Sequence, residues 1–218
     1  MPGPAGLASS RLARLAQASA IRVEEALEPC ELCGAPIAAE HRHVLDLSNR
    51  EVMCACRACA ILFDNPAAGA GHYRLVPERR LRVDDLQLAD TDWEDLRLPV
   101  EMAFFFEHTG AGRVMAYYPS PVGPTESELR LDAWDRIADA NPVLRTMAPD
   151  VEALLVNRAR GASAHLVVPI DECYALVGLI RARWRGFTGG AEVWKGITQF
   201  FEELDRRART VSRTGERR

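Results

Sequence analysis

The sequence has no apolar run approaching the roughly 20 residues that a membrane-spanning helix needs. It also lacks the apolar core of a secretory signal peptide, because residues 1–20, MPGPAGLASSRLARLAQASA, are rich in alanine, serine and arginine. We therefore expect a cytoplasmic protein without a membrane span. Thiols stay reduced in that compartment, so clustered cysteines indicate metal or redox chemistry before disulfides.

Excess positive charge is missing as well. Lysine and arginine total 27 against 31 acidic residues, for a net charge of -4. Proteins that bind nucleic acid usually carry a basic face, so we expect no nucleic-acid partner. The charge is uneven along the chain, since residues 84–96 are acidic and the C-terminal residues are basic. Such runs are typical of solvated segments.

Cysteine is scarce, yet it is concentrated in one region. The chain has six cysteines, and the two C-x-x-C pairs are Cys30 with Cys33 and Cys56 with Cys59. Two such pairs at this separation are a strong signal for a zinc site, because each pair directs two thiolates toward one point. Gly34 suits the positive φ of a turn after the first pair, whereas Ala60 makes the second turn less typical. Four thiolates leave no open coordination position, which predicts a structural Zn site.

The identity of the metal and the role of Cys54 stay open at this point. Four thiolates suit iron as well as zinc, so a rubredoxin-like iron site is the alternative. Cys54 lies two residues before Cys56 and would face the same side of a strand. It could be a spare ligand, a redox-sensitive thiol, an iron–sulfur ligand or a small apolar filler, of which the filler is the commonest.

Other residues allow weaker functional hypotheses. His41 and His43 are competing metal ligands, but a nuclease site would need a further partner set, and Asn65 and His72 do not supply a convincing one. Cys173 stands near the start of an expected helix with Asp171 as its N-cap, and it shares the spacing of a buried helical face. We therefore interpret Cys173 as a core residue instead of a nucleophile paired with His165.

The patterning divides the chain into five parts. We expect a mobile N-terminal arm over 1–28, a zinc-ribbon-like β module over 29–78, a charged linker over 79–97, an α+β domain over 98–208 and a basic tail over 209–218. Alternating residues predict two strands within 41–56 and four more within 99–119 and 151–170. Helical periodicity predicts helices over 131–140, 171–184 and 189–208, and YPSPVGPTES indicates a loop. The fold class is thus α+β, with a small, mainly antiparallel sheet and C-terminal helices.

Several motifs together resemble a family of bacterial proteins of unknown function. They are CELCG, EHRHVLDL, CACRACAILFD, YRLVP, AYYPSP, EALLVNR, VVPIDECYALVGLIR and WRGFTGGAEVW, and they cover roughly residues 29–204. Members of that family are typically encoded beside genes for aerobic, high-affinity nickel–iron hydrogenases. The resemblance matches Cys30, Cys33, Cys54, Cys56 and Cys59 to the family's cysteine pattern. It implies a hydrogenase subunit or maturation protein as partner, and it carries no established activity.

These observations lead to one functional hypothesis and one rival. The first is a non-enzymatic accessory protein with a structural zinc site, which acts by protein contact in the assembly or maturation of a nickel–iron hydrogenase. The rival is a rubredoxin-like iron–thiolate electron carrier or redox guard for the same system.

Overall fold

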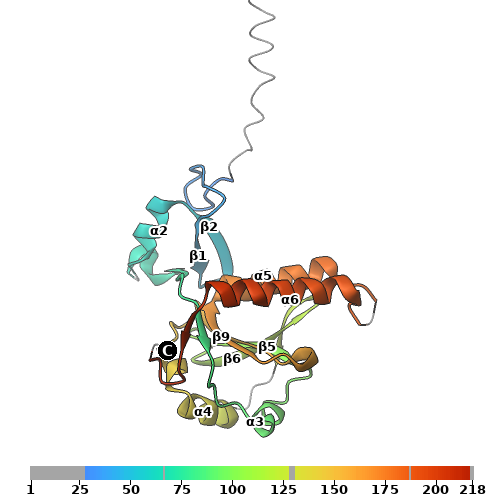
Figure 1. Ribbon diagram of the computed structural model, residues 1–218. Coiled ribbons are helices and arrows are strands. Elements are labelled where there is room, and N and C mark those ends of the chain that lie inside the picture. Colours follow the sequence, from blue (N-terminus) through green and yellow to red (C-terminus); the bar gives the residue numbers. More distant parts are fainter. Residues whose placement is uncertain (1–27, 66, 128–130, 187, 217–218) are drawn as a thin grey trace, which may run out of the picture.

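The computed structural model describes residues 28–216 except 66, 128–130 and 187. Within those residues it is a mixed α+β fold with two sheets and five α-helices (Figure 1). The predicted α+β class is therefore confirmed. The expected N-terminal arm lies outside the described residues except for Glu28. Among the helices described, none is both long enough and apolar enough to span a membrane.

The smaller sheet builds the cysteine-rich module. It has the order β2-β1-β3, with β1 at Arg42–Asp46, β2 at Glu51–Ala55 and β3 at Tyr73–Leu75, and both pairings are antiparallel. These two strands are the pair expected from the alternating residues within 41–56. Helix α2 (Arg57–Phe63) follows β2 directly, and a short 3-10 helix, η1 (Ala68–Gly71), precedes β3.

The larger sheet has seven strands in the order β10-β4-β9-β8-β5-β6-β7. Among the strand pairs within the described residues, only β10–β4 is parallel. The strands are β4 (Leu81–Val83), β5 (Met102–His108), β6 (Arg113–Ser120), β7 (Gly123–Ser127), β8 (Glu152–Asn157), β9 (Ala164–Pro169) and β10 (Arg209–Val211). The sheet is thus mainly antiparallel, as predicted, and wider than the predicted strands alone would make it.

Helices cover both faces of this sheet (Figure 1). Because side chains alternate along a strand, Phe104 and Phe106 of β5 face one layer while Phe105 faces the other. The first layer is α5 (Ile170–Arg183) and α6 (Gly190–Arg207), and the second is α3 (Asp90–Asp95) and α4 (Leu131–Ala140). Two short 3-10 helices complete the described elements, η2 (Pro142–Thr146) and η3 (Ala159–Gly161).

Three expectations about segment boundaries need correction. The segment expected as a linker, 79–97, contains β4 and α3, and its Leu81, Val83 and Trp93 are buried in the domain core. The expected basic tail begins with β10, which pairs with β4. The expected proline-rich loop is the tight β6–β7 hairpin, where Ser120 pairs with Gly123. Short strands and prolines at a sheet edge leave little periodicity for a sequence pattern to detect.

The module and the larger domain share a core. Leu45 of β1 and Val76 belong to the same buried cluster as the α5 and α6 residues. Polar contacts add to this junction, since Arg50 pairs with Asp150 at 2.8 Å and His43 pairs with Asp171 at 2.7 Å. The junction therefore fixes the β1–β2 hairpin against helix α5.

Candidate metal centre

The first C-x-x-C pair lies in a tight turn that its own backbone closes. The Gly34 N–H donates to the Cys30 carbonyl at 2.7 Å, and the Cys30 N–H donates to the Ala35 carbonyl at 2.7 Å. Gly34 has φ +75°, a conformation that costs other residues energy, as the sequence predicted. The turn is tied to β2, because the Cys54 N–H donates to the Glu31 carboxylate at 2.5 Å.

The second pair lies at the start of a helix instead of in a matching turn. Cys56 is the N-cap of α2, and the Cys59 N–H donates to its sulfur at 3.5 Å. One turn of helix brings the thiols of residues three apart to the same side. Ala60 follows as a buried helical residue, so no glycine is required there. This explains why the second pair departs from the turn signature of the first.

The four predicted cysteines converge on one point. The Sγ atoms of Cys30, Cys33, Cys56 and Cys59 all lie within 4.8 Å of one another, and the Cys33 and Cys56 sulfurs are 3.6 Å apart. All four are free thiols; Cys30 and Cys59 are buried, and Cys33 is exposed. Such a set could hold a tetrahedral metal ion with sulfur ligands. Its position at the edge of the module would let the ion join the first turn to α2.

The surroundings of these thiols give them different pKa values. Burial opposes ionisation of Cys30, but backbone N–H groups from Cys56, Leu32 and Cys33 outweigh it and lower its pKa to about 6. The Cys59 N–H lowers the pKa of Cys56. Burial and the neighbouring thiols raise the pKa of Cys59. Metal binding to the set would therefore release protons, and acid would weaken it.

Cys54 does not join this set, although it is only two residues from Cys56. It forms a second group with His41 and His43, in which one ligand atom from each residue lies within 4.8 Å of the others. In β1–β2 pairing His43 stands directly opposite Cys54, and His41 lies two residues before His43, just ahead of β1. The two histidines are therefore not ligands that compete for the four-cysteine site.

The remaining sequence candidates do not form a site with one another. Cys173 is fully buried in the core of α5, and burial raises its pKa well above the ordinary thiol value, which confirms it as a core residue. Asp171 lies in the first turn of α5, whose N-cap is Pro169, and its carboxylate contacts His43. His72 is exposed, and the Asn65 side chain accepts from the Ala67 N–H. These positions favour no nuclease or thiol-enzyme site.

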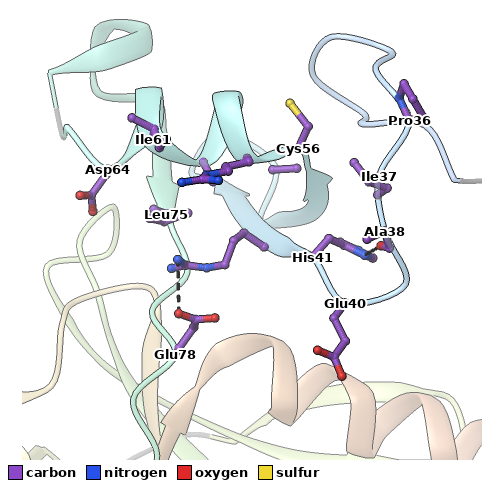
Figure 2. A pocket seen from close by; sticks show the side chains of 14 residues that line it. Pro36, Ile37, Ala38, Glu40, His41, Cys56, Ile61, Asp64, Leu75 and Glu78 are labelled. Carbon is purple, nitrogen blue, oxygen red and sulfur yellow. Dashed lines mark hydrogen bonds and ion pairs between the residues drawn. The ribbon is translucent and has the colours of Figure 1, made fainter.

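A cleft of about 670 Å³ runs beside the four-cysteine set (Figure 2). Its wall includes the apolar side chains of Ile37, Ile61 and Leu75, and Cys56 lies at its margin. Charged side chains also line the cleft. Among them is Arg42, which pairs with Glu78 at 3.4 Å. The cleft therefore combines apolar and charged surface within the cysteine-rich module.

Comparison with known proteins places the chain in a family but not with a characterised relative. Residues 29–208 match the model of a family of unknown function, DUF5947, and because the match covers most of the chain, the chain belongs to that family. No curated protein and no solved structure matches it significantly.

Proposed function

We propose that this member of the DUF5947 family is a non-enzymatic accessory protein whose N-terminal module is held together by a structural zinc ion. The observation that carries the proposal is the convergence of four cysteine sulfurs within 4.8 Å. A four-thiolate set fills the tetrahedral shell of zinc and leaves no position for a substrate. Zinc binding worth about 10–16 kcal/mol would exceed what the small apolar core of the module can supply.

The exposed face of α2 supports a role in protein contact. Ile61 and Leu62 are adjacent and are 67% and 56% exposed. Ile61 also lines the cleft, where Arg42, Arg57 and Glu78 surround the apolar wall. Apolar centres with charged rims are characteristic of protein interfaces. We therefore assign the partner-binding surface to α2 and this cleft.

The identity of the partner comes from the resemblance in sequence motifs. CACRACAILFD, which supplies Cys56, Cys59 and the exposed Ile61 and Leu62, is one of the motifs that match the hydrogenase-associated family. We propose that the partner is a subunit or a maturation protein of a nickel–iron hydrogenase. The same motif would then provide both the metal ligands and the contact residues.

The test uses the full-length chain purified without added metal, with Cys33→Ser as the matched variant. We expect wild-type protein to contain one more zinc equivalent than Cys33→Ser by elemental analysis. If iron is lost instead, together with thiolate charge-transfer absorption that bleaches on reduction, the four cysteines form a rubredoxin-like electron carrier and the structural-zinc proposal is wrong.

The partner assignment has its own test in cells that lack the chromosomal gene. The double variant Ile61→Ser/Leu62→Ser should keep its metal and its circular dichroism spectrum but lose hydrogenase activity and co-purification of hydrogenase subunits. Val122→Ser is the control, because Val122 is also an exposed apolar residue, at 85%, but lies in the β6–β7 turn. Unchanged hydrogenase activity in the double variant would refute the assignment of this surface.

A further inference from the structure

A second cluster of metal-ligating side chains lies between the cysteine-rich module and helix α5. His41, His43 and Cys54 each place one ligand atom within 4.8 Å of the other two. The cluster is a consequence of the hairpin register, since His43 and Cys54 are cross-strand partners and His41 is two residues before His43. Cross-strand partners have Cβ atoms about 4.5–5.5 Å apart, close enough for both side chains to reach one ion.

Hydrogen bonds determine which nitrogen of each imidazole is free. His41 Nδ1 is 3.0 Å from the Ala38 carbonyl, and His43 Nδ1 is 2.7 Å from the Asp171 carboxylate. A carbonyl and an ionised carboxylate only accept hydrogen bonds, so each Nδ1 carries the proton. In the neutral imidazole the lone pair is then on Nε2, which is the state that binds a metal ion.

The Nε2 atom of His41 is buried and has no hydrogen-bond partner within the part of the chain that the structure describes. A buried polar atom without a partner costs about 1–3 kcal/mol, so such atoms call for an explanation. The rings of His41 and His43 meet edge to face with centroids 5.0 Å apart. Two nitrogen atoms that each carry a lone pair cannot form a hydrogen bond with each other, whereas both can bind the same cation.

Asp171 provides the support that metal-bound histidines usually have. Histidine ligands commonly donate their second ring N–H to a carboxylate, which fixes the tautomer and strengthens the ligand. Asp171 belongs to α5, so this contact also connects the cluster to the larger domain. The Asp171 Oδ1 atom accepts from the Glu172 N–H at 2.9 Å, which holds the carboxylate in place.

From these contacts we infer that His41, His43 and Cys54 form a second metal site, with His41 Nε2, His43 Nε2 and Cys54 Sγ as its ligands. Two imidazoles and one thiolate suit a borderline or soft transition-metal ion such as zinc, cobalt or copper. Three protein ligands leave one tetrahedral position for an exogenous donor.

A cleft at the junction of the two parts adjoins the two histidines. His41 and His43 both line this cleft, which has a volume of about 670 Å³ and is also lined by Asp171, Glu172 and Arg207. A water molecule or a small anionic or thiol ligand could therefore complete the coordination. The four-cysteine set is closed by comparison, so the two sites differ in chemistry: one stabilises the module, and the other presents an ion with an open position.

The test is a cobalt titration of full-length, reduced protein that already holds one equivalent of zinc. Zinc binds thiolate sites more tightly than cobalt does, so it retains the four-cysteine site. We expect a further equivalent of Co²⁺ to bind, with tetrahedral ligand-field bands and one thiolate-to-cobalt charge-transfer band. Cys54→Ala should abolish the charge-transfer band, and His41→Gln or His43→Gln should abolish binding of this equivalent.

Two variants separate ligation from structure. Asp171→Asn should weaken cobalt binding by about 10–100-fold, the usual effect of losing a carboxylate behind a histidine ligand. His72→Gln removes an exposed histidine outside the cluster and should bind cobalt as the wild type does. The inference is wrong if zinc-loaded wild type binds no further cobalt, or if the cobalt that it binds is unaffected by His41→Gln, His43→Gln and Cys54→Ala.

Discussion

Replacing Arg50 by alanine should destabilise the native protein, because it removes the cation from a buried ion pair at the junction of the two parts. Arg50 lies in the β1–β2 turn and reaches Asp150, whose side chain is 1% exposed. The Nη1 and Nη2 atoms of Arg50 donate to the Asp150 carboxylate at 2.8 Å and to its carbonyl at 3.3 Å. The guanidinium also lies 4.9 Å from the ring centroid of Phe106.

The expected magnitude follows from what remains around Asp150 after the change. Removing one partner of a buried ion pair typically costs about 3–5 kcal/mol. Asp150 would keep the Thr109 hydroxyl at 2.6 Å and the Thr109 N–H at 3.1 Å, and Arg74 is 4.0 Å away. These contacts place the cost near the lower limit, about 3 kcal/mol. For a chain of this size the melting temperature should fall by about 6–12 °C.

The assay is urea unfolding of metal-loaded protein, followed by circular dichroism, in a double-mutant cycle with Asp150→Asn. Asparagine tolerates the positive φ of +68° at this position, so that variant reports the loss of charge. The two changes together should cost about 2 kcal/mol less than their sum. Arg113→Ala is the control, since its pair with Glu126 is exposed and worth at most about 1 kcal/mol. A cost for Arg50→Ala no larger than that of the control would refute the reasoning.

Three further changes test the module and the sheet. Cys33→Ser should remove one metal equivalent and raise hydrogen exchange throughout 30–63, while the seven-stranded sheet keeps its protection. Gly34→Ala should cost about 1–2 kcal/mol in urea unfolding, since φ is +75° there and no atom lies near an added Cβ, and Gly34→Asn should cost less. Burial and the charge of Arg158 lower the pKa of His165. Below about pH 6.5 the unfolded chain therefore binds a proton at His165 more readily than the native protein does. The free energy of unfolding should decrease as the pH is lowered, and His165→Gln should make that decrease smaller.

The elements that sequence reasoning found are those with a local pattern. The β1–β2 hairpin showed two short segments with the alternation typical of strands, and α6 showed a helical stripe of which Val193, Ile197, Phe201 and Leu204 are buried. The strands β4 and β10 have three residues each, and they pair although they are far apart in the sequence. Three residues are too few to show a periodic pattern. Their formation depends on long-range pairing, which a sequence window does not contain.

The same distinction applies to the two clusters of ligands. The four cysteines are apparent because each C-x-x-C pair is itself a local unit. The second cluster requires the register that places His43 opposite Cys54, and that register depends on the length of the turn. The contact of Asp171 with His43 comes from a helix distant in sequence, so no spacing rule would have indicated it.

The arrangement of the two clusters has a consequence for how metal binding and domain packing depend on each other. Cys54 and Cys56 are two residues apart at the end of β2, yet each belongs to a different cluster. An ion at the four-cysteine set would fix the end of β2, and with it the position of Cys54 opposite His43. His43 in turn contacts Asp171 of α5, and Arg50 at the other end of the hairpin contacts Asp150. Filling the four-cysteine set should therefore precede and favour binding at the second cluster.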